Sequence, residues 1–437
     1  MKILRDLPSE SRILFATRLL RLFAYGFLSV VLALYLAQLG LEEGGIGLLL
    51  SLTLLGDTAI SLWITTHADR IGRRRMLAAG ALLMILAGAL FAVTRSFPLL
   101  LLAATIGVIS PSGNEVGPFL SIEQASLAQL VSDRQRTRVF AWYNLVGSFA
   151  TATGALAAGL LAQQLQRAGF SPLNSYRVVV LGYAAAGAAL LALFLRLSPA
   201  IEAPAQAAGQ AGQVTGSRVP RRFLGLGRSR NVVLRLAALF SLDAFAGGLV
   251  VQSLLAYWFN TRFGVQPGVL GAIFFGANIL AGVSALSAAW VAGRIGLINT
   301  MVFTHLPSNL LLMLVPLMPS LGLAVALLLL RFSISQMDVP TRQSYTMAVV
   351  EPDERSAASG VTGVARTVGA ALSPVLAGAL LAVPGLSALP FLLSGALKIV
   401  YDLGLYFGFR RLKPPEEQRT SPPASDPVPV DQPDRTG

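Results

Sequence analysis

A set of ionisable side chains lies within long apolar stretches of this sequence, and these are the residues in which we expect its chemistry. They are Asp57, Glu115, Glu123, Asp243, Arg331, Asp338, Arg342, Arg366, Lys398 and Asp402. An ionised side chain is costly in an apolar environment, so each is expected to face a cavity or a partner. Carboxylates placed in this way can bind and release protons, and we interpret the set as proton-coupling or cavity-lining residues.

Glu115 is the leading candidate for a protonatable carboxylate in a cavity. It lies in the segment "SPSGNEVGPFLSIEQ", which is polar and rich in glycine and proline. Pro111 and Pro118 lack backbone donors, so they are expected to bend or break the helix there. Broken backbone inside a membrane is tolerated only where it lines protein or water. Glu123 is expected nearer the cytoplasmic mouth, and Asp57 lies near the middle of its own apolar segment.

The second half of the chain offers charges at similar depth. Asp243, Arg331 and Arg366 fall near the middle of their segments. Lys398 and Asp402 are four residues apart, so they share one helix face and are expected to neutralise each other as a structural ion pair.

Other polar residues in these segments have plainer expected roles. Arg18 and Arg21 lie three apart on one helix face, and we expect them to extend their charged ends to the membrane surface rather than bind an anion. His305 is expected to be a hydrogen-bonded packing residue. With only two histidines and no cysteine, the composition argues against a zinc site. No cofactor, metal or nucleotide-binding loop is expected.

The elements that must position these residues are apolar helices. Of the 437 residues, 54% are hydrophobic and only 13% are charged, which excludes a soluble enzyme. A helix needs about 20 apolar residues to cross a bilayer. Twelve segments qualify: 13–38, 46–66, 76–94, 98–130, 138–163, 178–197, 234–258, 268–292, 300–318, 321–350, 357–382 and 390–409. The predicted fold class is therefore an all-α integral membrane protein.

The excess of positive charge indicates orientation rather than a nucleic-acid partner. The net charge is +13, and with the N-terminus inside, 24 Lys and Arg residues fall on the cytoplasmic side against four outside. This asymmetry predicts a multi-pass protein with both termini in the cytoplasm, and we expect it in the cell membrane.

The chain divides into two halves that repeat. We predict a six-helix bundle over 1–197, a flexible cytoplasmic linker over 198–233, a second bundle over 234–410 and a disordered cytoplasmic tail over 411–437. An offset of 219 pairs Gly159 with Gly378, and an offset of 224 pairs Gly72 with Gly296. Two such repeats are a known transporter construction, with the substrate site at their interface near the midplane.

The repeat also aligns two residues of opposite charge. By the offset of 219, Arg342 occupies the position of Glu123, while Asp338 lies one turn before it. The two copies could meet as a gate pair between the halves. Separate contacts with lipid headgroups are an equally good interpretation.

The segment "ADRIGRRRML" resembles the signature loop of the major facilitator superfamily between its second and third helices. The matching positions include Asp69, Arg70, Gly72 and Arg73, whereas Thr65 and His67 depart from the motif. The resemblance implies a fold of two six-helix bundles. It also implies a gating latch, meaning a contact of Asp69 and Arg73 with the start of the eleventh helix that holds the halves together on the cytoplasmic side.

Together these features predict a secondary active transporter rather than an enzyme. We expect a monomer that moves a small organic solute across the lipid bilayer by rocking of the two halves, with proton coupling through Glu115 or Asp57 and with export favoured over uptake. A facilitative uniporter and a proton-linked uptake permease remain alternatives. A non-transporting membrane sensor or scaffold is the alternative from another class.

Overall fold

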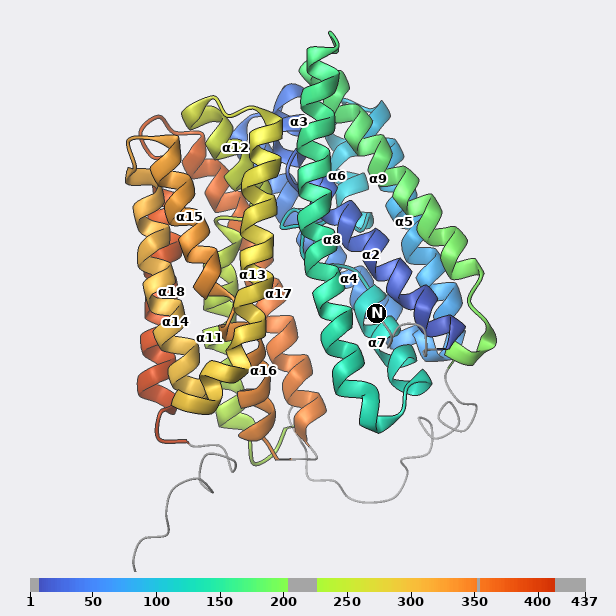
Figure 1. Cartoon of the computed structure of the whole chain (residues 1–437), viewed down its shortest axis with the longest axis vertical. Coiled ribbons are helices and arrows are strands. Elements are labelled where there is room, and N and C mark those ends of the chain that lie inside the picture. Colours follow the sequence, from blue (N-terminus) through green and yellow to red (C-terminus); the bar gives the residue numbers. More distant parts are fainter. Residues whose placement is uncertain (1–7, 203–225, 352–353, 413–437) are drawn as a thin grey trace, which may run out of the picture.

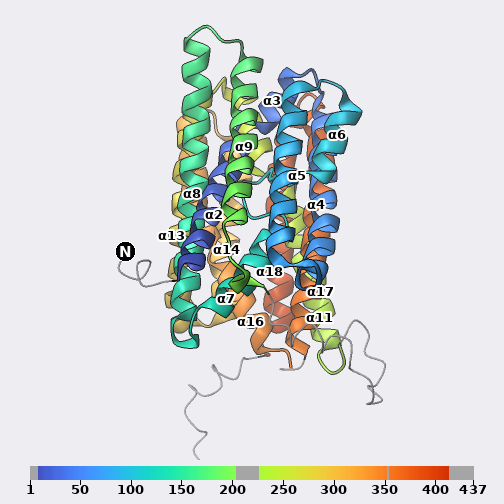
Figure 2. The same ribbon diagram turned by 90° about the vertical axis from the view of Figure 1, so that its right-hand side faces the viewer.

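The protein forms two helical bundles that stand side by side (Figure 1). A computed structural model describes residues 8–202, 226–351 and 354–412. Most of the predicted linker and the tail from residue 413 onward lie outside the described residues. We call residues 8–202 the N-half and residues 226–412 the C-half. In Figure 2 the N-half stands in front of the C-half.

Each half is built from eight α-helices in the described chain. In the N-half they are α2 (Ser9–Ser29), α3 (Leu32–Gln38), α4 (Glu43–Ile71), α5 (Arg73–Val93), α6 (Phe97–Ile106), α7 (Phe119–Leu130), α8 (Asp133–Arg167) and α9 (Pro172–Leu195). In the C-half they are α11 (Arg230–Gly248), α12 (Gln252–Phe263), α13 (Pro267–Ile295), α14 (Leu297–Leu314), α15 (Leu321–Ser335), α16 (Asp338–Ala348), α17 (Arg355–Leu381) and α18 (Leu389–Phe409). Short 3₁₀ turns follow α9, at Pro199–Ile201, and α14, at Val315–Leu317.

These helices account for the twelve predicted spans. Ten helices or continuous helix pairs are long and apolar enough to cross a membrane, and α2 with α3, bent by 43°, forms an eleventh. The remaining predicted span, 98–130, is two shorter helices, α6 and α7, joined by an irregular segment. The two-bundle membrane fold predicted from the sequence is confirmed.

The break in this span falls where its prolines predicted it. α6 ends at Ile106 and α7 begins at Phe119, so Pro111 and Pro118 both lie in or beside the irregular segment 107–118. Gly113 and Gly117 adopt φ angles of +72° and +81°, which side chains with a Cβ rarely adopt. The segment can therefore fold back toward α2 and α4 instead of continuing as a helix.

The halves pack closely at one end of the molecule, and glycines make this possible. Between the halves, α4 packs against α17 and α8 packs against α13. A Cβ on Gly47 would lie 2.9 Å from the Cα of Gly378, and a Cβ on Gly159 would lie 2.8 Å from the Cα of Gly271. Gly47 and Gly271 are 224 apart, and Gly159 and Gly378 are 219 apart, so the two crossings are the same contact in the two repeats.

This closed end is the one at which α4 and α13 begin, and we call it the distal end. Polar contacts between the halves add to it: Gln252 Nε2 donates to Ser29 Oγ at 2.7 Å, and Tyr257 Oη donates to Glu43 Oε1 at 2.7 Å. The opposite end, where α2, α11 and α17 begin, is the terminal end (lower in Figure 1). There a Cβ on Gly293 or Gly360 would meet no atom within 4 Å. The described glycine and polar contacts that join the halves therefore lie toward the distal end, and Gly293 and Gly360 at the terminal end make none.

Candidate functional site

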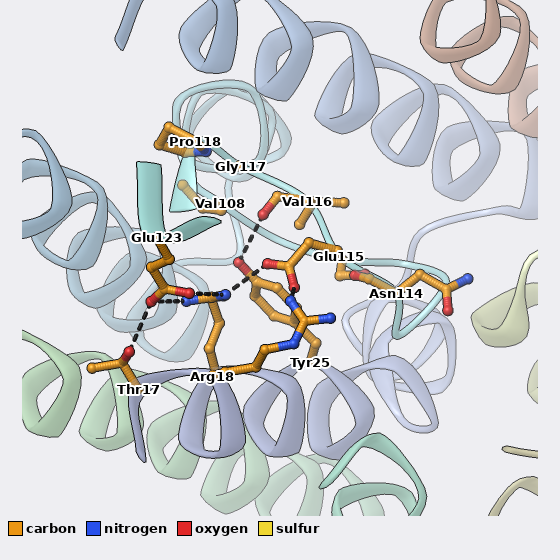
Figure 3. Close-up of polar contacts among 12 residues, drawn as sticks. Thr17, Arg18, Tyr25, Val108, Asn114, Glu115, Val116, Gly117, Pro118 and Glu123 are labelled. Carbon is orange, nitrogen blue, oxygen red and sulfur yellow. Dashed lines mark hydrogen bonds and ion pairs between the residues drawn. The ribbon is translucent and has the colours of Figure 1, made fainter. Parts of the chain in front are cut away.

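Two arginines and two glutamates form a buried ion-pair cluster in the core of the N-half. The guanidinium of Arg21 donates from Nη1 and Nη2 to the two carboxylate oxygens of Glu123, each at 2.7 Å. Its Nε donates to Glu115 Oε1 at 2.8 Å, and Arg18 Nη1 donates to Glu115 Oε2 at 2.6 Å. Figure 3 shows the two carboxylates turned toward the α2 arginines from the broken segment and from α7. We call these four residues the N-cluster.

Neighbouring side chains complete the hydrogen bonding of the N-cluster. Thr17 Oγ1 donates to Glu123 Oε1 at 2.8 Å, and the Tyr143 hydroxyl donates to Glu123 Oε2. Arg18 Nε donates to the carbonyl oxygen of Tyr143 at 2.9 Å. Arg21 and Glu123 have no exposed surface. The N-cluster is thus neutral overall and shielded, which is the arrangement that makes buried charges tolerable.

One expectation for the N-half is wrong. Arg18 and Arg21 do not reach the membrane surface, because Glu115 of the folded-back segment and Glu123 of α7 lie against their helix face. Glu115, predicted to be a protonatable cavity carboxylate, is paired with both arginines. The three-residue spacing of the arginines showed that they share a face, but nothing in the sequence showed that the broken segment returns to it.

Asp57 is a buried carboxylate of the N-half that forms no ion pair with the described residues. It is 6% exposed on α4 and accepts one hydrogen bond, from the backbone N–H of Gly117 at 3.1 Å. Its second oxygen, Oδ1, is buried and has no hydrogen-bond partner among the described residues. Gly117 lies in the break between α6 and α7, outside any helix. Its N–H is therefore not used in a helical hydrogen bond and can donate to Asp57.

The C-half holds a second cluster, centred on Asp243 of α11. Lys398 Nζ donates to Asp243 Oδ1 at 2.5 Å, and Arg342 Nη1 donates to Asp243 Oδ2 at 2.9 Å. Arg342 also lies 3.3 Å from Asp338 Oδ2, one turn earlier on α16. We call these residues, together with His305, Asp402, Arg331 and Arg366, the C-cluster.

The expected pairing of Lys398 with Asp402 is wrong. Lys398 reaches Asp243 on the neighbouring α11 instead. Asp402 accepts a hydrogen bond from Asn309 Nδ2 at 2.8 Å and lies 2.9 Å from His305 Nδ1. The spacing of four placed both groups on one face of α18, but partners on α11 and α14 offered shorter contacts.

The expected gate pair between Glu123 and Arg342 is also not formed. Each is buried in its own half, Glu123 against Arg21 and Arg342 against Asp243. Burial likewise rules out the headgroup contacts considered for them, since their exposed fractions are 0% and 4%.

His305 has a larger polar role than the sequence indicated. Its imidazole lies between two carboxylates, with Nδ1 2.9 Å from Asp402 and Nε2 4.0 Å from Asp243. The sequence signal, a lone histidine on α14, could not show that carboxylates from two other helices flank it.

Arg331 on α15 and Arg366 on α17 remain without ion pairs. Neither makes a salt bridge or a side-chain hydrogen bond within the described ranges, and the Nε of each is buried without an acceptor. Arg331 is 8% exposed, and its Cζ lies 5.0 Å from the centre of the Phe332 ring.

The loop that resembles the signature motif is bonded within the N-half. Arg73 Nε donates to Asp69 Oδ1 at 2.8 Å, and the backbone N–H of Arg73 donates to a carboxylate oxygen of Glu202 at 2.6 Å. Gly72 has a φ of +113°, which allows the turn between α4 and α5. Asp69 is 61% exposed and Arg70 is exposed, so in this conformation neither contributes a contact to the described start of α17. The contact expected of a gating latch is not formed in this conformation, and Glu202 is a partner that sequence reasoning missed.

The terminal end of the C-half has a matching carboxylate in Glu354. It accepts backbone hydrogen bonds from Gly227, Arg228 and Ser229, just before α11. Burial tends to raise the pKa of this carboxyl, but these donors outweigh it and hold the pKa below its usual value. No group of three or more His, Asp or Glu side chains able to hold a metal ion occurs in the described part of the chain.

Comparison with known proteins agrees with this architecture. The family model described as Major Facilitator Superfamily matches residues 14–372. The chain is 31% identical over 415 residues to the uncharacterized membrane protein YJR124C of Saccharomyces cerevisiae, covering 90% of this chain and 92% of that protein.

More distant matches are partial or structural. Over 145 residues the chain is 26% identical to the quinolone resistance protein NorA of Staphylococcus aureus, covering 33% of this chain and 36% of that protein. A bacterial homologue of the human lysosomal transporter Spinster, solved in an inward-facing and unoccupied conformation, superposes with a TM-score of 0.69 at 14% identity. That superposition covers 92% of this chain and 97% of the other.

Proposed function

Because the chain belongs to the major facilitator superfamily, we propose that it carries a small organic solute across the cell membrane by alternating access, driven by protons and in the export direction. The observation that carries this proposal is the asymmetric contact between the halves. The described glycine and polar contacts between the halves lie toward the distal end, and none of the described hydrogen bonds or ion pairs joins the halves at the terminal end, as expected of one of two alternating states.

The geometry of the distal contact favours rocking of the two halves as rigid bodies. The two glycine crossings are equivalent in the two repeats, so they can separate together about one axis. The polar contacts at this end join neutral or hydrated side chains, such as Gln163 Nε2 to Gln266 Oε1 at 2.7 Å. Such contacts are weak enough to exchange for water when the distal end opens.

Asp57 is the best-supported proton carrier. A carboxylate with one backbone donor and one unpartnered buried oxygen gains little from ionisation, so it can be protonated without breaking an ion pair. Protonation of Glu115 would instead leave two arginines without their counter-ion. The ionisable groups that interact electrostatically with Asp57 are Glu115, Tyr25 and Tyr183, and none of them is a cation.

Direction and orientation rest on sequence. The described chain begins and ends at the terminal end, and the arginine-rich connection between α4 and α5 lies there too, so we propose that this end faces the cytoplasm. The partial identity with a resistance protein favours export over uptake.

The absence of cysteine allows a direct test of alternating access. In a Gln163→Cys, Gln266→Cys double variant, spin labels at the distal end should report a short distance in the state described here. Addition of transported solute should populate a second, longer distance. A pair that joins the halves at the terminal end, Gln135→Cys on α8 with Gly293→Cys on α13, should change in the opposite sense. A single distance at both ends under all conditions would contradict alternating access.

The same labelled protein tests proton coupling. We expect the distal distance distribution to depend on pH between pH 5 and pH 8 in the parent protein and to lose that dependence in Asp57→Asn. Asn299→Ala, a half-buried site near the start of α14, is the control and should keep it. A distribution that does not change with pH in the parent protein would favour a facilitative uniporter.

A further inference from the structure

The C-cluster has more cations than carboxylates, and its carboxylates are already engaged. The charged groups are four cations, Arg331, Arg342, Arg366 and Lys398, and three carboxylates, Asp243, Asp338 and Asp402. Asp243 binds Arg342 and Lys398, Asp338 pairs with Arg342, and Asp402 is held by His305 and Asn309. The surplus therefore resides on Arg331 and Arg366.

Arg331 points into the core of the C-half rather than toward lipid. The buried residues of α15 form one stripe, at Ala324, Leu328, Arg331 and Ser335. The stripe continues to Gln336, whose backbone N–H donates to Ser284 Oγ on α13 at 3.2 Å. A guanidinium on this stripe cannot reach the headgroup region by extending outward along the lipid-facing surface.

Arg366 approaches the same region from α17. Three residues later, a Cβ on Gly369 would lie 2.7 Å from Ser241 Oγ of α11, so this turn of α17 lies against the turn of α11 that precedes Asp243. Asp243 and Asp338 interact electrostatically with both Arg331 and Arg366, yet neither forms an ion pair with them. Both arginines therefore lie within electrostatic range of the same two carboxylates of the C-cluster, and neither is neutralised by an ion pair with the described residues.

Neither guanidinium has a hydrogen-bond acceptor among the described residues. The Nε atoms are buried without acceptors, whereas the outer nitrogens keep accessible surface and make no hydrogen bond to the described residues. The Phe332 ring stabilises Arg331 from one face only. A buried guanidinium without an acceptor is costly, and a planar oxyanion is the ligand that matches its fork of donors.

We propose that Arg331 and Arg366 bind the anionic group of the transported solute, a carboxylate, sulfonate or phosphate. This inference rests on the proposed transport function and narrows it to an organic anion. The bound oxyanion accepts hydrogen bonds from the outer nitrogens of the two arginines and balances the surplus charge of the C-half. Asp243 and Asp338 hold the neighbouring Arg342 and Lys398, so these two cations do not compete for the solute.

The test is a binding measurement that does not require transport. The full chain is placed in phosphatidylcholine nanodiscs at fixed ionic strength, and its melting temperature is titrated with benzoate, benzenesulfonate and phenyl phosphate. Benzamide and benzenesulfonamide are the uncharged controls of similar shape. We expect at least one anion to raise the melting temperature while its neutral counterpart does not.

Variants then assign the binding to the two arginines. Arg331→Gln and Arg366→Gln should each weaken the apparent affinity by about 10- to 100-fold, because each removes a charged hydrogen-bond donor. Arg331→Lys should retain part of it. Arg294→Gln is the matched control, since Arg294 is an exposed arginine of the same half that stacks on Trp290 at 3.6 Å. Its affinity should equal that of the parent protein.

Several outcomes would overturn the proposal. The first is that no anion is preferred over its neutral counterpart, and the second is that Arg331→Gln binds the anion with the same affinity as the parent protein. The third is that the melting temperature rises only when phosphatidylglycerol is added, which would assign the site to a lipid headgroup. The melting temperature without probe shows whether each variant is folded. Loss of the proposed transport cycle would appear in the spin-label distances, whereas loss of anion recognition appears only in these titrations.

Discussion

The N-cluster and the C-cluster contain similar residues and differ in how completely those residues satisfy one another. In the N-cluster the three donor nitrogens of Arg21 all meet carboxylate oxygens, and two cations balance two anions. In the C-cluster Arg331 Nε and Arg366 Nε are buried without partners in the described chain, and so are Asn309 Oδ1 and Tyr401 Oη of two residues that lie against His305. One cluster is complete by itself, and the other leaves buried guanidinium nitrogens without acceptors.

This difference indicates that the two clusters have different roles. A complete network is stabilised by its own contacts and fixes the folded-back segment against α2. That segment in turn supplies the Gly117 N–H to Asp57. An incomplete network is costly in the empty state and is stabilised when an anion arrives. Charge inside a membrane protein can therefore serve rigidity in one half and recognition in the other.

The largest expected effect on stability comes from removing one ion-pair partner from the N-cluster. Arg21→Met removes the cation shared by Glu115 and Glu123 and leaves buried carboxylates with a single arginine. We expect a loss of about 3–5 kcal/mol in the free energy of unfolding, the usual result of breaking a buried ion pair on one side. Urea unfolding in detergent measures it.

The control for this variant is Arg12→Met on the exposed face of the same helix, which should change the free energy of unfolding by less than about 0.5 kcal/mol. The double variant Arg21→Met, Glu123→Leu should recover part of the loss. If Arg21→Met were no less stable than Arg12→Met, the N-cluster would not be the structural unit described here.

A smaller effect is expected from the centre of the C-cluster. Asp243→Asn removes the negative charge shared by Lys398 and Arg342 and replaces one of its two acceptor oxygens with an amide group. A lysine can lose its proton when its counter-ion is removed, however, and Asp338 remains beside Arg342. We expect a loss of about 2 kcal/mol in the free energy of unfolding.

Asp338→Asn, which removes the longer contact of 3.3 Å to Arg342, is the matched comparison and should lose less than Asp243→Asn. A loss for Asp243→Asn as large as that for Arg21→Met would show that the two clusters are equally rigid.

Sequence reasoning predicted the fold well, because the signals for it are local. Runs of about 20 apolar residues define the spans, and the repeat offsets pair Gly72 with Gly296 and Gly159 with Gly378. Pro111 and Pro118 marked the break because proline acts on its own helix. None of these inferences needs to know which helices are neighbours.

The same reasoning failed for contacts between helices, because these depend on which helices are neighbours in the fold. Lys398 and Asp402 share a helix face, yet each finds its partner on another helix. Arg18 and Arg21 gain partners only because residues 107–118 fold back toward α2. The ionisable positions within the spans can be read from the sequence, but their pairing is a property of packing between helices, which a single sequence does not contain.

The smallest expected effect on stability comes from Asp57, a buried carboxylate that belongs to neither cluster. Asp57→Asn keeps an acceptor for the Gly117 N–H and removes a buried charge without a counter-ion, so the free energy of unfolding should change by about 0.5 kcal/mol or less. Glu123→Gln, an equally small change in the same half, places an amide against Arg21 and Tyr143 and should cost about 3 kcal/mol. Urea unfolding of the pair above pH 7 compares a free carboxylate with a paired one. A loss for Asp57→Asn that matches Glu123→Gln would mean that Asp57 holds the fold together, and its assignment as the proton carrier would then lose its structural basis.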